Sequence, residues 1–167
     1  MKKTLPILWL TGNTGAGKTT LARGIERHCN SLLPNHHPLA RRVIVLDGDD
    51  MRASISKDLQ FSPEERNANN LRIATLARVF QARGFLVVVA VIAPFAWIRK
   101  DVDTLCNPIW IYVSRHAPDR TDAPYEIPAS PSFHIDNAVL TKVEALTMLL
   151  DSTEALTGIA ATVEVNV

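Results

Sequence analysis

Residues 12–19 read Gly-Asn-Thr-Gly-Ala-Gly-Lys-Thr and satisfy the pattern G-x-x-x-x-G-K-[ST] in full. A short apolar run at residues 7–10 precedes the motif, and a helical pattern that begins near Lys18 follows it. Glycines in such a loop let successive backbone N–H groups point at phosphate oxygens, and the helix N-terminus adds positive potential. The stretch therefore predicts a phosphate-binding loop between a strand and a helix, against the alternative of a chance glycine-rich turn.

Two side chains of the motif carry its expected chemistry. The Lys18 ammonium is expected to neutralise charge on the β- and γ-phosphates of ATP, and the Thr19 hydroxyl is expected to ligate Mg²⁺. The motif thus predicts ATP as a co-substrate together with Mg²⁺. The residues expected to bind ATP are those of the loop and of the first helical turn: Gly12, Asn13, Thr14, Gly15, Ala16, Gly17, Lys18, Thr19 and Thr20.

Short apolar runs alternate with longer amphipathic ones along the chain. The short runs lie at residues 7–10, 43–46, 85–92 and 109–113. Nearly continuous apolar stretches are typical of strands that are covered on both faces. The alternation predicts an α/β fold with a mostly parallel sheet and helices on both faces, the three-layer architecture of P-loop NTPases.

Local signals predict two of the helices. Residues 62–65 carry a capping box with Pro in the first turn, and Gly84 can end the helix that starts there. A final helix is expected from about Asp136 to Gly158, whereas the proline-rich residues 114–132 predict a loop. The inward face of the final helix is expected to consist of Leu140, Val143, Leu146 and Leu150.

The composition limits the class of protein. Lys and Arg number 18 against 17 Asp and Glu in 167 residues, a net charge of +1, which argues against a nucleic-acid binder or a membrane-surface protein. No apolar run reaches the length of a membrane span, and 2 cysteines are too few for a disulfide scaffold. We expect one cytoplasmic domain over residues 1–167. Its alternating tail, residues 159–167, could close the sheet or pair with a partner, as in a homodimer.

Carboxylates follow the second apolar run directly, in Asp47-Gly48-Asp49-Asp50. Because ligands of open α/β sheets bind beyond the carboxyl ends of the strands, this acidic turn is expected to face the phosphate loop. Its carboxylates could hold Mg²⁺ through water, with Asp47 as the candidate beside Thr19, and could act as a base toward a substrate hydroxyl. The structural alternative is that Asp50 caps the next helix and Asp47 only belongs to a turn.

Several ordered segments resemble the adenylylsulfate kinase family. They are residues 9–18, 46–52, 57–66, 69–73 and 91–95. The similarity covers most of residues 5–105 and resumes at residues 122–126 and 131–136. Because independent segments match in order, the resemblance is far more specific than the phosphate loop alone.

This resemblance implies a single P-loop kinase domain that transfers the γ-phosphoryl group of ATP to the ribose 3′-hydroxyl of adenosine 5′-phosphosulfate (APS). Asp49 would be the base at that hydroxyl, with Lys18 as the second catalytic residue. The substrate-binding residues that the resemblance implies are Asp49, Arg52, Phe61, Arg66, Asn69, Ile92 and Phe95. The two arginines and Asn69 would hold the phosphosulfate, and the two phenylalanines would enclose the adenine. Plain core packing is the alternative for both phenylalanines.

The chain departs from the family at its acceptor side. The family has a long basic lid after the fourth strand, whereas only residues 114–121 connect the fourth apolar run to the next matching segment. Arg115 and Arg120 are the local cations that could replace those of the lid. In addition, Ala93 and Ala96 stand where the family has a serine and a basic residue.

These departures leave two alternatives open. One is a kinase of the same fold that acts on another nucleotide-linked acceptor, such as a nucleotide phosphoramidate. The other is a nucleotide-binding accessory protein without turnover. The retention of Lys18, Thr19, Asp47 and Asp49 argues against the second alternative, because an inactive kinase commonly loses one of them.

Overall fold

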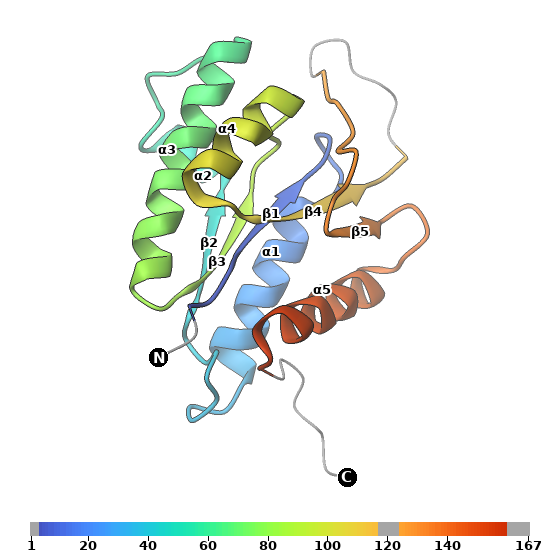
Figure 1. Cartoon of the computed structure of the whole chain (residues 1–167). Helices are drawn as coiled ribbons and strands as arrows, with labels where there is room; N and C mark the ends of the chain where they lie inside the picture. Colours follow the sequence, from blue (N-terminus) through green and yellow to red (C-terminus); the bar gives the residue numbers. More distant parts are fainter. Residues whose placement is uncertain (1–3, 117–123, 160–167) are drawn as a thin grey trace.

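A parallel sheet lies at the centre of the molecule (Figure 1). The computed structural model describes residues 4–116 and 124–159. The strands are β1 (Ile7–Thr11), β2 (Val43–Asp47), β3 (Leu86–Ala90), β4 (Ile109–Ser114) and β5 (Phe133–Asp136). Their order is β2-β3-β1-β4-β5, and each neighbouring pair is parallel.

Helices cover both faces of the sheet (Figure 1). The helices are α1 (Lys18–Arg27), α2 (Gly48–Ala53), α3 (Pro63–Ala82), α4 (Ala96–Cys106) and α5 (Lys142–Thr157), and the π-helix η1 (His28–Leu32) continues α1. Along β1, Leu8 and Leu10 pack with α1 and α5, whereas Ile7 and Trp9 pack with α3 and α4. Alternate side chains of β1 therefore enter two separate cores. The predicted three-layer α/β fold is confirmed.

The capping box at the start of α3 is confirmed. The Glu65 N–H donates to the Ser62 hydroxyl at 3.2 Å, and the Ser62 N–H donates to the Glu65 carboxylate at 3.3 Å. At the other end, Gly84 follows with φ 86°, a conformation that glycine adopts at little cost. Gly158, with φ 67°, ends α5 as expected.

The prediction that the final helix starts near Asp136 is wrong. Residues Phe133–Asp136 form β5, and α5 begins at Lys142 after the cap Thr141. Only two of the four side chains in β5 are apolar, so a search for continuous apolar runs misses this edge strand. Val143, expected to face inward, is 75% exposed, because α5 turns Ala145 and Leu149 toward the sheet instead.

Of the tail predicted over residues 159–167, all but Ile159 lies outside the described residues. Within residues 4–116 and 124–159, no helix combines the length and the apolar character needed to cross a bilayer.

Candidate active site

The phosphate loop joins β1 to α1 through tight backbone geometry. Gly17 adopts φ 102° directly before α1, and a Cβ atom there would lie 2.5 Å from the side-chain nitrogen of Asn137. A Cβ atom on Gly12 would lie 2.0 Å from the carbonyl oxygen of Val113. Side chains at these two positions would collide with β4 and with the turn after β5, so the fold requires glycine at both.

Lys18 is buried beneath its own loop. Its ammonium donates to the carbonyl oxygens of Gly12 at 2.7 Å and of Asn13 at 2.8 Å. Burial lowers the pKa of Lys18 to about 8, although the charges of Asp47 and Asp49 act in the opposite direction. The ammonium is therefore a poorly solvated cation, which anionic oxygens would stabilise.

Asp47 connects the acidic turn to the phosphate loop. Its carboxylate accepts a hydrogen bond from the Thr19 hydroxyl at 2.7 Å and one from the Asp49 N–H at 3.0 Å. Asp47 is thus the N-cap of α2, whereas Asp50 lies in the first turn and pairs with Arg23 at 2.6 Å. The prediction that Asp50 caps the helix is wrong, because the N-cap is Asp47. The other carboxylate oxygen of Asp47 accepts the hydrogen bond from the Thr19 hydroxyl.

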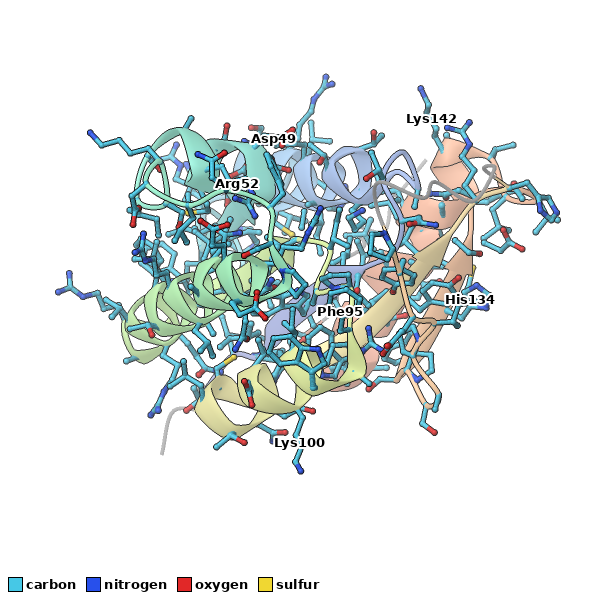
Figure 2. All side chains as sticks on the ribbon, turned by 90° about the horizontal axis from the view of Figure 1, so that it is seen from above. Asp49, Arg52, Phe95, Lys100, His134 and Lys142 are labelled. Atoms are coloured by element: carbon cyan, nitrogen blue, oxygen red, sulfur yellow. The ribbon has the colours of Figure 1, made fainter. Side chains whose placement is uncertain are left out.

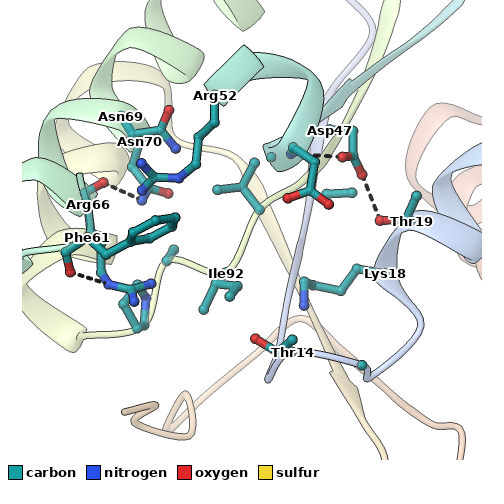
Figure 3. A pocket seen from close by; sticks show the side chains of 17 residues that line it. Thr14, Lys18, Thr19, Asp47, Arg52, Phe61, Arg66, Asn69, Asn70 and Ile92 are labelled. Atoms are coloured by element: carbon teal, nitrogen blue, oxygen red, sulfur yellow. Dashed lines mark hydrogen bonds between the residues drawn. The ribbon is translucent and has the colours of Figure 1, made fainter. Parts of the chain in front are cut away.

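A cleft of about 490 Å³ extends from the phosphate loop and the acidic turn to α3 and residues 90–94 (Figure 3). Most of the expected site residues line it, namely Thr14, Gly15, Lys18, Thr19, Asp47, Asp49, Arg52, Phe61, Arg66, Asn69 and Ile92. The cleft therefore brings together residues from the phosphate loop, α2, α3 and the end of β3. Figure 2 shows Asp49 and Arg52 on the same side of the molecule, seen from above.

The Phe61 ring lies between two guanidinium groups, as Figure 3 shows. The central guanidinium carbon is 4.4 Å from the ring centroid for Arg52 and 5.4 Å for Arg66. Arg66 also donates to the Phe61 carbonyl oxygen at 2.9 Å, and Arg52 donates to that of Gln60 at 2.8 Å. Burial and the neighbouring Arg66 lower the pKa of Arg52. Two cations so close together favour an anion beside them.

Buried amides of α3 also face this end of the cleft. The side-chain oxygens of Asn69 and Asn70 are buried and accept no hydrogen bond from the described residues, although both residues line the cleft. A ligand donor would satisfy such oxygens. The amide nitrogen of Asn70 donates to the Arg66 carbonyl oxygen at 2.7 Å. Asn70 is not among the site residues predicted from the sequence, because nothing in the sequence separates it from an ordinary helix residue.

Phe95 and Arg115 do not line this cleft. Phe95 does not line the cleft and stacks on Trp97, with ring centroids 6.2 Å apart and ring planes 6° apart. Arg115 lines another cavity, of about 520 Å³, together with Thr20 and residues of α1 and α5. Arg120 lies outside the described residues.

Comparison with known proteins agrees with this geometry. The model of the family described as adenylylsulphate kinase matches residues 5–121. The chain belongs to the adenylylsulfate kinase family. It is 31% identical to the Bacillus pumilus adenylyl-sulfate kinase over 170 residues, an alignment that covers 87% of this chain and 83% of that protein.

Two further proteins are similar to this chain. The Myxococcus xanthus adenylyl-sulfate kinase is 42% identical over 101 residues, which cover 60% of this chain and only half of that protein. The solved structure of the Mycobacterium tuberculosis APS kinase CysC in complex with AMPPNP and APS has a TM-score of 0.77. At 24% identity, with 90% of this chain and 98% of that chain covered, this second likeness shows the shared fold.

Proposed function

We propose that this chain is an ATP-dependent adenylylsulfate kinase that phosphorylates the ribose 3′-hydroxyl of APS. The observation that carries the proposal is that Asp49 lines the same cleft as Lys18 and Arg52. Burial lowers the pKa of both cations, and the negative charge of Asp49 acts in the opposite direction on each. A donor phosphate at Lys18 and an acceptor anion near Arg52 would therefore meet beside Asp49.

The proposed step is an in-line transfer. The 3′-oxygen of the acceptor forms a bond to the γ-phosphorus of ATP, and the bond from that phosphorus to the β–γ bridging oxygen breaks. Asp49 takes the hydroxyl proton, and ADP leaves with the bonding electron pair. Lys18 would exchange the carbonyl oxygens of Gly12 and Asn13 for phosphate oxygens, where its charge offsets the charge of the leaving group.

The donor atoms of Thr19 and Asp47 fit Mg²⁺. A hydroxyl oxygen and a carboxylate oxygen 2.7 Å apart are hard ligands of the type that Mg²⁺ prefers. When bound, Mg²⁺ would neutralise charge on the β- and γ-phosphates. We infer that phosphate oxygens and water complete its coordination, because Mg²⁺ takes about six ligands.

The acceptor would use the far end of the cleft. Arg52, Arg66 and Asn69 would bind the phosphosulfate oxygens, because guanidinium forks and amides match such groups. The adenine would stack on Phe61 after one guanidinium group moves from the ring toward the phosphosulfate. Phe95 stays a candidate for the opposite wall of the adenine site.

The test is an assay of ADP release with a panel of acceptors. We expect ADP release with APS to exceed that with AMP, adenosine 5′-phosphoramidate or water by at least about a hundredfold in kcat/KM, because only APS fills the anion site. The catalytic control is Asp49→Asn, in which kcat should be at least about a hundredfold lower with every acceptor. A higher kcat/KM with the phosphoramidate would contradict the proposal and favour the other acceptor.

A further inference from the structure

The acceptor wall, which we define as residues 91–95, has an unusual set of hydrogen bonds. Four consecutive carbonyl groups, from Val91 to Pro94, each accept a hydrogen bond from a different donor. The donors are the Trp9 indole, the Thr11 hydroxyl, the Arg99 guanidinium and the Glu126 backbone N–H. Because β1, α4 and the segment around residue 126 supply these donors, the wall depends on contacts distant in sequence.

The backbone conformation of Ala93 is one reason why the acceptor wall needs these hydrogen bonds. Its φ of 44° lies in the left-handed region, which is strained for a residue with a Cβ atom. The buried Arg99 donates to its carbonyl oxygen at 2.9 Å. Since Ile92, Ala93 and Pro94 line the cleft, this strained loop sets the shape of the acceptor end.

Two hydrogen bonds of Glu126 connect the acceptor wall to the start of α4. The Ala96 N–H donates to the Glu126 carboxylate at 2.7 Å, and the Glu126 N–H donates to the Pro94 carbonyl oxygen at 2.8 Å. The N-cap residue of α4 is Phe95, whose side chain makes no capping hydrogen bond. Glu126 therefore acts as the cap from a distant segment, with its negative charge at the positive end of an 11-residue helix.

Tyr125 links the same segment to the phosphate loop. Its hydroxyl lies 3.0 Å from the Thr11 hydroxyl, and Thr11 directly precedes Gly12. The single hydroxyl proton of Thr11 goes to the Ile92 carbonyl oxygen, so the Tyr125 hydroxyl is the donor to Thr11. Burial raises the pKa of Tyr125 to about 12, which keeps this proton in place.

We propose that Glu126 and Tyr125 are positioning residues that fix the acceptor wall relative to the phosphate loop. The inference rests on the proposed function, because it treats the wall as the surface against which APS lies. Neither side chain needs to touch APS. Their role is to hold Ile92–Pro94 where the 3′-hydroxyl meets Asp49, so their loss should weaken the use of APS more than the use of ATP.

The experiment compares Glu126→Ala with Glu126→Gln, and uses Asp151→Ala on the exposed face of α5 as a control for charge loss. Glu126→Ala should raise the KM for APS about tenfold, the effect of losing one cap, and change the KM for ATP less than twofold. Hydrogen exchange of the Ala96 amide should become faster. Glu126→Gln should restore the parental KM for APS and the parental exchange rate of the Ala96 amide, because a glutamine oxygen can still accept from the Ala96 N–H.

Three results would overturn the inference. One is unchanged exchange of the Ala96 amide in Glu126→Ala, which would mean that the hydrogen bond from the Ala96 N–H to the Glu126 carboxylate does not form. Another is faster exchange with an unchanged KM for APS, and the third is an equal rise of both KM values with a lower Tm, which a purely structural role would produce. If the parent protein does not use APS, the proposed function fails, and the same KM comparison is made with the acceptor that supports ADP release.

Discussion

The two ends of the cleft are held in different ways. At the phosphate end, the loop is shaped by its glycines, and Lys18 bonds to carbonyl groups five and six residues away. At the acceptor end, the wall of residues 91–95 depends on donors from residues 9, 11, 99 and 126. A site made by local backbone can be recognised as a motif, whereas one made by distant contacts emerges only with the fold. The two ends should therefore respond differently to substitution.

The largest effect is expected at the phosphate end, from Lys18→Ala. Loss of this cation should abolish phosphoryl transfer, at a cost of at least about 4 kcal/mol in transition-state stabilisation. Lys100→Ala, on the exposed surface of α4, is the matched control and should keep the parental kcat. Near-normal ADP release by Lys18→Ala would mean that the loop does not bind the transferred phosphate.

Asp49→Asn tests the residue between the two ends. The amide keeps the size of the side chain but does not accept the hydroxyl proton, so kcat should fall by about two to four orders of magnitude while ATP binding persists. Asp50→Asn, which removes an exposed carboxylate from the same turn, serves as the control. If kcat survives and the Mg²⁺ requirement rises instead, Asp49 belongs to the metal site and Asp47 becomes the candidate base.

Arg66→Ala tests the acceptor end alone. Removal of one of the two guanidinium groups beside Phe61 should raise the KM for APS about tenfold to a hundredfold, the cost of a lost hydrogen bond to a charged group. The KM of Arg66→Ala for ATP should change less than twofold. In the control Arg83→Ala, which removes an exposed arginine, the KM for APS and the KM for ATP should both change less than twofold. A parallel rise of both KM values in Arg66→Ala would show that the ends are not independent.

The pH profile of the ATP reaction follows from the pKa of Lys18. Because this pKa is lowered from 10.5 to about 8, the ammonium of the free protein loses its proton as the pH rises through about 8. The value of kcat/KM for ATP should then fall about tenfold per pH unit above that point. Over the same range the unfolded chain binds more protons at Lys18, so this residue makes the folded state more stable as pH rises from about 8 to 10.5. A flat rate profile between about pH 7 and 10 would contradict the assignment.

Arg115→Ala is expected to have the smallest effect on the use of APS. Arg115 lines the cavity between α1 and α5 and does not line the cleft with Asp49, so kcat/KM for APS should stay within about twofold. A tenfold decrease at saturating ATP would instead make Arg115 a substitute for the cations of the family's lid.

The sequence predicts the phosphate end well because its information is local. The complete motif, the apolar run before it, the helical pattern after it and the acidic turn after β2 are sufficient to bring Lys18, Thr19 and Asp47 together. The capping box at Ser62 likewise predicts the start of α3, because both of its hydrogen bonds join residues within four positions.

The acceptor end could be predicted only through resemblance, and then only in part. Phe61 and Arg66 lie in the cleft, but Phe95 stacks on Trp97, which is a contact with no sequence signal of its own. Strand β5 was missed because its polar residues, His134 and Asp136, interrupt the apolar pattern. Glu126 caps a helix that begins 30 residues earlier, and no local rule links such positions.

We propose that both ends serve one reaction, the transfer of the γ-phosphoryl group of ATP to the 3′-hydroxyl of APS beside Asp49. The most direct test is to incubate the protein with Mg²⁺, APS and ATP labelled at the γ-phosphate, and to locate the label in the product by phosphorus NMR and cleavage with a 3′-nucleotidase. We expect one new phosphate monoester on the 3′-oxygen, formed at least about a hundredfold more slowly by Asp49→Asn. A label on any other oxygen, or ADP formation with unlabelled APS, would contradict the proposal.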